Sequence, residues 1–356
     1  MEDPRLGLLL EGRYRIEERL AAGGMGVVYR GERVGLSKPV AIKFLHRSAA
    51  IKSDRRQRFE REAAAMSRLS HPNLVSIIDF GSLDDVPYLV MDYHPGASLK
   101  KVLEGGALRP GRAVFIARQL LAGLASAHAS GVVHRDLKPD NVLIVGKPGE
   151  DLVKILDFGV AKLLEGDGGP SELSVMASTL LGTPEYMSPE QARSEQVDAR
   201  ADLYAVGILL YEMATGRKPF QAERDLAVLR KQIEEAPASP RGLEPAISEG
   251  LEKVILRALA KERDQRWQTA EEFSRALSRA PEGRAATSHG AVQRPATQAP
   301  IVTDRTLRVG SSRPVRVRPL LIAALLVAIG IGAWAAVDRG VVELPDWLGG
   351  KSPSGR

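Results

Sequence analysis

A short stretch of the chain, residues 132–145 (VVHRDLKPDNVLIV), concentrates polar side chains between two apolar runs. Apolar flanks predict that the stretch is half buried, and burying charge is costly unless a partner compensates it. These side chains therefore need partners, and they are the first candidates for chemistry. Six of the eight residues from 134 to 141 are polar: His134, Arg135, Asp136, Lys138, Asp140 and Asn141.

Other motifs surround this stretch along the chain. Residues 20–29 (LAAGGMGVVY) place glycines between two strand-like runs. A hairpin with glycines at its tip lets backbone N–H groups approach phosphate oxygens closely, although glycine turns are common. The run VAIK ends in Lys43, which is either one inward lysine among apolar neighbours or a surface lysine on an edge strand. Glu62 lies in an amphipathic stretch and is expected to neutralise Lys43. DFG at 157–159 and GTPEYMSPE at 182–190 follow.

The elements that must position these residues change along the chain. β-type runs dominate the start, and "RRQRFEREAAAMSRL" among them has the period of a helix, with Phe59, Ala63 and Met66 on one face. After about residue 98 the pattern is mostly helical, as in 113–131. A sheet-rich start followed by a helix-rich remainder predicts two lobes. The expected strands are 14–20, 26–32, 39–45, 74–81 and 87–93.

Composition and charge exclude several classes of function. A chain of 356 residues without cysteine has no disulfide, no cysteine-based zinc site and no thiol nucleophile. The net charge is +6, and seven arginines with one acid between Arg284 and Arg318 account for all of it. The rest of the chain shows no basic bias, so nucleic acid is not an expected partner. The arginine run is either a solvated linker or a functional segment, and no N-terminal signal peptide is expected.

A second long-range feature is the uncharged run of eighteen residues at 320–337. As a helix it is about 27 Å long, close to the hydrocarbon thickness of a bilayer. Arginines precede it, so the positive-inside rule predicts one membrane span at 319–337, with the lobes in the cytoplasm and 338–356 outside. We therefore expect a single-pass protein of the cell (inner) membrane. The alternative is a buried core helix.

In this order and at these separations, the motifs resemble those of the eukaryotic-type (Hanks-type) protein serine/threonine kinases, particularly bacterial membrane-anchored members. The resemblance covers residues 12–280 and implies an α+β, bilobal kinase fold. The small β-rich lobe with one helix spans about 12–93, and the larger helical lobe spans about 98–280. A basic linker at 281–318 would then precede the C-terminal transmembrane helix.

The resemblance implies a role for each candidate in phosphoryl transfer, which needs positioning and charge neutralisation. Asp136 would accept or orient the substrate hydroxyl proton, and Lys138 would contact the γ-phosphate. Asn141 and Asp157 would hold Mg²⁺, with Mn²⁺ as an alternative. Lys43, aligned by Glu62, would bind the α- and β-phosphates of ATP. Further nucleotide-binding residues are Ala21, Ala22, Gly23, Gly24, Gly26, Val28, Ala41, Met91 (the gatekeeper), Asp92, Tyr93, His94 (with Asp92 and Tyr93, the hinge) and Leu143.

Supporting contacts also follow from the resemblance. His134 and Phe158 would form a packed stack with Met66, so His134 is expected to be a core histidine, as is His128. Asp202 would brace the polar stretch from below. A buried pair between Glu190 and Arg266 would fix geometry more than it stabilises.

The substrate class follows from smaller features. Lys138 is typical of serine/threonine kinases, and Thr183 would hydrogen-bond near Asp136 and Lys138. Arg135 implies control by a phosphate on the segment between DFG and SPE. The candidate acceptors there are Ser178, Thr179 and Ser174. Ala21 stands where the family has its first glycine, so a modest loss of nucleotide affinity is expected.

Three interpretations remain open. The first is an active kinase with protein substrates that carry Ser/Thr acceptors, tethered to the membrane, with a homodimer as one route to autophosphorylation. The second is a pseudokinase scaffold, which generally lacks at least one of the residues that are present here. The third is a binder of anionic lipid through 284–318, which leaves the first 280 residues unexplained.

Overall fold

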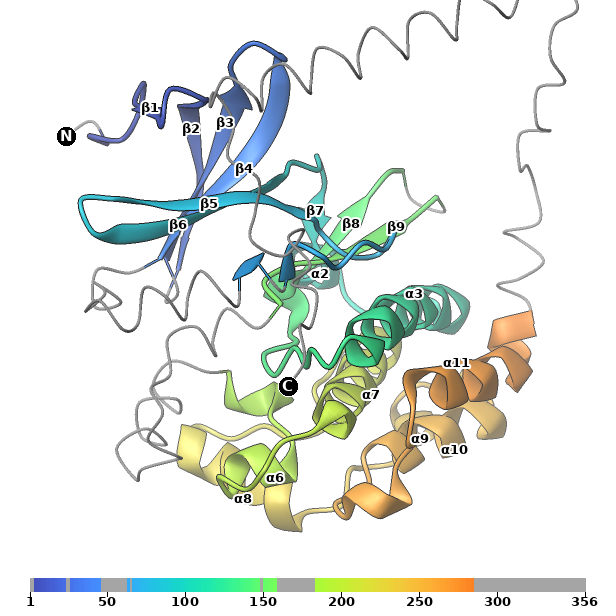
Figure 1. Cartoon of the computed structure of the whole chain (residues 1–356). Coiled ribbons are helices and arrows are strands. Elements are labelled where there is room, and N and C mark those ends of the chain that lie inside the picture. Colours follow the sequence, from blue (N-terminus) through green and yellow to red (C-terminus); the bar gives the residue numbers. More distant parts are fainter. Residues whose placement is uncertain are drawn as a thin grey trace, which may run out of the picture. The chain divides into compact units, whose positions relative to one another are not determined.

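The computed structural model describes residues 3–23, 26–45, 63–64, 66–147, 150–158 and 183–284 (Figure 1). The chain divides into two units, Met1–Arg294 and Pro295–Arg356, and every described residue belongs to the first. The expected membrane span at 319–337 lies outside the described residues. Within those residues, no helix has the length and apolar character needed to cross a bilayer.

The N-terminal part is a six-stranded antiparallel sheet with the strand order β1-β2-β3-β4-β6-β5. Tyr14 and Ile16 are the buried residues of β2, and they pack with Tyr29 of β3 into a core that also includes Phe44 and Tyr88. The five predicted strands are all present, and a short additional strand precedes them. The strands are β1 (Leu9–Leu10), β2 (Tyr14–Gly23), β3 (Gly26–Arg33), β4 (Lys38–Leu45), β5 (Ile77–Leu83) and β6 (Val86–Asp92).

The C-terminal part is helical around α7, almost all of which is buried. Asp198 caps the start of α7 through its side chain, and Gly216 ends the helix at φ 70°, a left-handed conformation that suits glycine. α3 packs against both α7 and α11 (Figure 1). The helices are α2 (Leu99–Leu103), α3 (Pro110–Ala129), η2 (Pro139–Asn141), η3 (Pro184–Tyr186), α6 (Pro189–Ala192), α7 (Ala199–Thr215), α8 (Asp225–Glu234), α9 (Pro240–Leu243), α10 (Glu249–Ala258), η4 (Arg263–Gln265) and α11 (Ala270–Arg279).

A small sheet connects the two parts. It consists of β7 (Ala97–Ser98), β8 (Val142–Val145) and β9 (Leu152–Ile155), in the order β7-β8-β9. Leu74, just before β5, makes an isolated parallel bridge to Ile155 of β9. The predicted change from a sheet-rich to a helix-rich half is therefore confirmed. β8 directly follows the polar stretch, and β9 contacts Leu74 of the N-terminal part.

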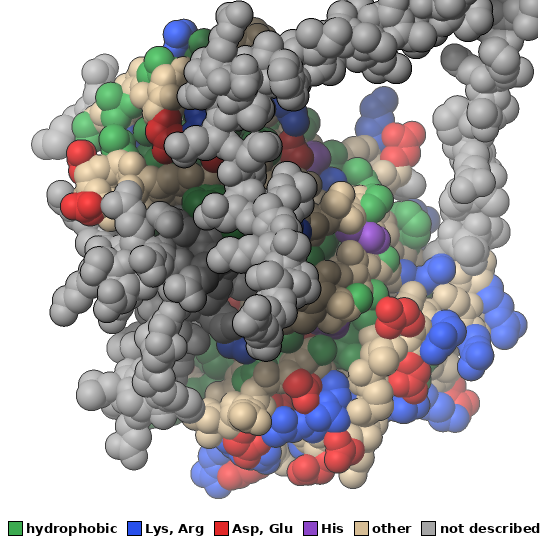
Figure 2. Space-filling model, viewed as in Figure 1, with side chains coloured by type: hydrophobic (Ala, Val, Ile, Leu, Met, Phe, Trp, Pro, Cys, Tyr) green, Lys and Arg blue, Asp and Glu red, His purple; other side chains and the backbone are tan. Residues whose placement is uncertain are grey.

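Charge is mixed on the visible face of the helical part. Figure 2 shows lysine and arginine side chains interspersed with aspartate and glutamate over this part. Several of these charges form ion pairs within or between helices, for example Lys253 with Glu249 at 2.6 Å and Arg257 with Glu272 at 3.2 Å. This pattern agrees with the absence of a basic bias in the corresponding sequence.

Candidate active site

A buried carboxylate holds the polar loop, residues 134–141, from below. Asp202 in the first turn of α7 is 1% exposed, and its oxygens accept from the backbone N–H groups of His134 at 2.8 Å and Arg135 at 2.9 Å. His128 on α3 also donates its ring Nε2–H to Asp202 at 2.7 Å. Arg135 has φ 67°, a conformation that costs about 1–3 kcal/mol for a residue other than glycine unless its surroundings enforce it. The expected brace by Asp202 is thus present, and it holds the strained turn just before Asp136.

Asp136 is the centre of a network of side chains within the polar loop. Lys138 places its Nζ 2.8 Å from Oδ2 and 3.1 Å from Oδ1 of this carboxylate. Asn141 donates its amide N–H groups to the Asp136 carbonyl at 2.7 Å and to Oδ2 at 3.1 Å. Two predicted site residues, Lys138 and Asn141, therefore converge on the carboxylate of a third, Asp136.

Lys43 joins the N-terminal sheet to this site. It lies on β4 with 4% of its surface exposed, and its Nζ is 2.6 Å from Oδ2 of Asp157. Buried lysine requires a compensating charge, and Asp157 supplies it. Asp157 has φ 57°, a second strained backbone position at the site. Lys43 is therefore not the edge-strand surface lysine of the alternative, while its expected partner Glu62 lies outside the described residues.

The β8–β9 hairpin brings Asn141 and Asp157 to the same end of the small sheet. Val142 pairs with Ile155, and the N–H of Leu156 donates to the Asn141 carbonyl at 2.9 Å. The amide nitrogen of Asn141 is already engaged by Asp136, whereas no hydrogen bond to its Oδ1 occurs within the described residues. Mg²⁺ prefers one or two protein oxygens together with phosphate oxygens. The donor set therefore fits a divalent cation that shares its coordination with a nucleotide.

His134 is a structural residue, as expected. It is 1% exposed, and its ring lies 4.7 Å from the Phe158 ring in an edge-on arrangement. Its Nδ1 accepts from the N–H of Asp136 at 3.2 Å, so its Nε2 carries the proton that is donated to the Leu156 carbonyl at 2.8 Å. Both ring nitrogens are thus engaged in holding the polar loop. His128 is engaged likewise by Asp202.

The glycine hairpin joins β2 to β3. Ala21 pairs with Val28 and Gly23 pairs with Gly26, while Gly24 lies outside the described residues. Ala21 lies in β2 directly after a shift in the β2–β3 register and has no positive φ, so alanine fits where the resemblance led us to expect glycine. Gly26 has φ 147°, and a Cβ at this position would lie 1.9 Å from the Phe44 carbonyl oxygen. Only glycine fits there.

The other predicted nucleotide contacts lie along β4, β6 and β8. Ala41 pairs with Met91, and Asp92 at the end of β6 forms an ion pair with Lys38 at 2.7 Å. The remaining candidates are Ala22 on β2, Tyr93 and His94 directly after β6, and Leu143, which pairs with Ser98. Burial is the main cause that lowers the pKa of His94.

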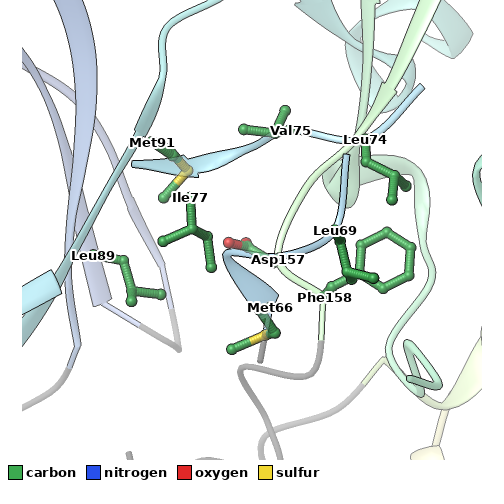
Figure 3. A pocket seen from close by; sticks show the side chains of 9 residues that line it. All are labelled: Met66, Leu69, Leu74, Val75, Ile77, Leu89, Met91, Asp157 and Phe158. Carbon is green, nitrogen blue, oxygen red and sulfur yellow. The ribbon is translucent and has the colours of Figure 1, made fainter. Parts of the chain in front are cut away.

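A small cavity is lined mostly by apolar side chains, among them Met91. Figure 3 shows the side chains that line this cavity, which has a volume of about 20 Å3. Met66 and Phe158 both contribute to it, in agreement with the expected stack. The lining residues are Met66, Leu69, Leu74, Val75, Ile77, Leu89, Met91, Asp157 and Phe158.

A hollow opens beside Asp136 on the other side of the polar loop. Residues 183–187, here called the acceptor segment, contribute Thr183, Tyr186 and Met187 to its lining, together with Asp136. The expected hydrogen bond of Thr183 to Asp136 or Lys138 is not formed among the described residues. Thr183 instead accepts through its carbonyl from the N–H of Tyr186 at 3.1 Å.

The chain after the acceptor segment is tied to both the loop and the helices. Gln191 donates its Nε2–H to the Arg135 carbonyl at 2.7 Å. Glu190 and Arg266 form the expected buried pair, with both guanidinium contacts at 2.8 Å. The Arg135 guanidinium forms no hydrogen bond or ion pair within the described ranges, and Ser174, Ser178 and Thr179 lie outside them.

Comparisons with known proteins decide the family. The protein kinase domain family matches residues 14–276. The chain belongs to the protein kinase family. It is 42% identical to the serine/threonine-protein kinase pkn3 of Myxococcus xanthus over 77% of this chain and 51% of that protein. It is 38% identical to the serine/threonine-protein kinase PrkC of Bacillus subtilis over 75% of this chain and 40% of that protein.

A solved structure gives the same result. The kinase domain of Mycobacterium tuberculosis PknI matches with a TM-score of 0.60 and 26% identity, over 76% of this chain and 97% of that one. The predicted resemblance to bacterial eukaryotic-type kinases is therefore confirmed, and membership implies the use of ATP, a divalent metal and protein substrates. The chain spans about half or less of the length of these curated kinases.

Three residues that contact the acceptor segment of this kinase domain were not predicted from the sequence: Glu212, Lys218 and Gln232. Tyr186 donates its hydroxyl to Glu212 at 2.6 Å, and Lys218 pairs with Glu185 at 2.8 Å. Burial raises the pKa of Glu212 and also that of Tyr186, which the nearby Glu212 carboxylate raises further. Gln232 on α8 bonds to the backbone of the acceptor segment. None of the three belongs to a motif, and only the apolar surroundings of Glu212 in "LLYEMA" could have marked it.

Proposed function

We propose that the chain is a protein serine/threonine kinase that transfers the γ-phosphate of ATP to Ser or Thr hydroxyls in a Mg²⁺-dependent reaction. One observation carries the proposal: Lys43 and Asp157 form a buried pair next to the polar loop, in which Lys138 and Asn141 converge on Asp136. Residues from separate segments meet there at the cost of two strained backbone positions, which a scaffold would have no need to maintain.

Each side chain has a distinct task in this proposal. Asp136 would accept the proton of the acceptor hydroxyl. Asn141 keeps the Asp136 carboxylate oriented by donating to its Oδ2 at 3.1 Å. Lys138 would neutralise the γ-phosphate of ATP. Lys43, aligned by Glu62, would bind the α- and β-phosphates of ATP. Asn141 and Asp157 would hold Mg²⁺ or Mn²⁺, which supplies positive charge that stabilises the phosphate oxygens.

Control by phosphorylation is also part of the proposal. Arg135 immediately precedes Asp136, and its guanidinium forms no hydrogen bond or ion pair with the other described residues. A phosphate on Ser178, Thr179 or Ser174 would provide a charge-assisted partner and so order the polar loop. Because the acceptor would belong to the same protein, a homodimer is a suitable arrangement for this autophosphorylation.

Transfer by the full chain is the direct test. The chain should move labelled γ-phosphate from ATP with Mg²⁺ to itself and to casein, and acid hydrolysis should release phosphoserine or phosphothreonine. Lys43→Met should remove the transfer because the phosphates lose their buried cation. No transfer by the unmodified chain would favour the scaffold interpretation, and full activity of Lys43→Met would remove Lys43 from the site.

Membrane attachment is a separate proposal, supported by the apolar run at 320–337 and the arginines before it. The kinase domain would lie in the cytoplasm, held at the inner membrane by one span, with substrates reached from the membrane surface. Deleting 319–356 should move the protein from the membrane pellet to the supernatant. Recovery of the full-length chain in the supernatant would contradict this proposal.

A further inference from the structure

The acceptor segment borders the hollow at Asp136, the carboxylate that is proposed to act on the acceptor hydroxyl. Thr183, Tyr186 and Met187 line the same hollow as Asp136. A protein acceptor that places its hydroxyl at Asp136 must therefore run along this segment. The position of the segment then decides how well acceptors bind.

Within the described residues, the side chain of Gln232 bonds to the backbone of this segment at two neighbouring residues. Gln232 donates its Nε2–H groups to the carbonyls of Glu185 at 2.8 Å and Pro184 at 3.2 Å. It is 0% exposed, so these bonds are formed without competition from water. A single side chain thereby fixes two consecutive carbonyl groups, and with them the path of the backbone.

The orientation of the Gln232 amide is itself fixed from behind. Tyr204 on α7 donates its hydroxyl to Oε1 of Gln232 at 2.7 Å, so the amide must turn its nitrogen toward the acceptor segment. Lys261 donates to the Gln232 carbonyl at 2.7 Å and caps the last turn of α8, where Lys231 also offers its carbonyl at 3.2 Å. The position of the Gln232 amide is therefore fixed by Tyr204 of α7 and by Lys261, which follows α10.

The side chains of the acceptor segment are held by other residues. Tyr186 bonds to Glu212, and Glu185 pairs with Lys218, whose Nζ also lies 5.3 Å from the centre of the Tyr186 ring. Lys218 and Glu185 are each about a quarter exposed, so their ion pair is expected to contribute little. The buried backbone contacts from Gln232 are thus the more decisive constraint.

We infer that Gln232 is a positioning residue of the acceptor segment, and that α8 thereby sets the affinity for protein acceptors while leaving ATP binding unaffected. This inference rests on the proposed kinase function. Gln232 lies on the helical side of the site, and it contacts neither Lys43 nor Asp157 among the described residues. Disturbing it should change recognition of the protein acceptor and not of the nucleotide.

The test is Gln232→Glu, which keeps the shape of the side chain but replaces both N–H donors by oxygen. The two buried carbonyls then face a carboxyl group that can donate at most one O–H, so at least one carbonyl loses its donor, and the KM for dephosphorylated casein should rise about tenfold or more. The KM for ATP should change by less than about twofold. Gln232→Asn, which keeps the amide but is shorter, should raise the casein KM by a smaller factor. This second variant keeps the test possible if Gln232→Glu does not fold.

Gln119→Glu on α3 is a matched control. Gln119 also bridges backbone groups, since its Nε2–H donates to the Asp151 carbonyl at 2.8 Å and its Oε1 accepts from the N–H of Val153 at 3.1 Å. It lies outside the acceptor segment, so its replacement should lower the unfolding midpoint without changing the casein KM. A general loss of stability would affect both variants alike.

The outcomes separate the two proposals. A selective rise of the casein KM in both Gln232 variants, absent in the control, supports the inference. An unchanged casein KM in a folded Gln232→Asn or Gln232→Glu, or equal rises of the ATP and casein KM values, overturns it. If the unmodified chain phosphorylates no acceptor, the proposed function fails first, and the inference fails with it.

Discussion

Replacing Glu190 by glutamine tests how the buried ion pair supports the site. Arg266 is 0% exposed and the Glu190 side chain 3%, and the two are joined by two contacts of 2.8 Å. Glu190→Gln leaves a buried guanidinium without a countercharge, a change that costs about 3–5 kcal/mol. Since a domain is stable by only about 5–15 kcal/mol, this loss should be large in a urea titration of the full chain at pH 7.

The paired variant separates the charge from the packing. Glu190→Leu combined with Arg266→Met removes both charges, and replacing a buried pair by apolar groups is often close to neutral. The guanidinium also donates to the carbonyls of Ala260 at 2.7 Å and Lys261 at 2.8 Å, and these bonds are lost as well. We expect the double variant to recover at least half of the stability lost in Glu190→Gln. A single variant within about 1 kcal/mol of the unmodified chain, or a double variant less stable than the single one, would refute the reasoning.

The same pair predicts a pH dependence. Burial alone would raise the pKa of Glu190, but the hydrogen bonds and charge of Arg266 outweigh it and lower the pKa below its model-compound value of 4.5. A carboxyl with a lowered folded pKa stabilises the fold above its unfolded pKa and loses this contribution as the pH falls through the folded pKa. The stability difference between the unmodified chain and Glu190→Gln should therefore be constant near neutral pH and shrink below pH 4.5. A difference that grows on acidification would contradict the lowered pKa.

Three further changes test separate contacts. Asp202→Asn should cost about 1–3 kcal/mol in a urea titration and lower kcat, because its amide cannot accept both loop N–H groups; unchanged kcat would contradict the brace. Gly26→Ala should weaken binding of a fluorescent ATP analogue, since its Cβ would lie 1.9 Å from the Phe44 carbonyl oxygen. Gly105→Ala, whose Cβ would meet no atom closer than 3.4 Å, should leave the affinity unchanged. Equal affinities of the two variants would contradict the close approach at Gly26. Burial lowers the pKa of Lys261 from 10.5 to about 8, so the stability of the unmodified chain relative to Lys261→Met should rise between pH 8 and pH 10.5, and a flat difference would argue against it.

Much of the fold could be predicted because local patterns agree with it. The strand-like runs at 14–20, 26–32 and 39–45 are local features, and the structure forms β2, β3 and β4 there, with Lys43 buried on β4. The contacts of Asp202 and of the Glu190–Arg266 pair were predictable only through the family resemblance. Their partners lie 67 to 76 residues apart along the chain, so no local pattern could reveal them.

Other features depend on tertiary arrangement and could not be predicted. Asp157 as the partner of Lys43 is one, because 114 residues separate the two and either partner is a common surface residue. Gln232 is another, since a single amide in an otherwise amphipathic helix has no distinguishing pattern. The start of the chain is a third: Asp3 accepts from the Tyr29 hydroxyl at 2.8 Å, although the residues before β2 carry only a two-residue strand.

The central claim is that Asp136 acts on the acceptor hydroxyl within a site completed by Lys43, Asn141 and Asp157. The most direct measurement is the initial rate of γ-phosphate transfer from ATP to casein by the full chain and by Asp136→Asn, at equal concentrations of correctly folded protein. A positioned general base contributes about 10²–10⁴-fold. The account predicts a loss of at least about 100-fold in kcat with the KM for ATP nearly unchanged. An Asp136→Asn protein that transfers phosphate as fast as the unmodified chain would contradict it.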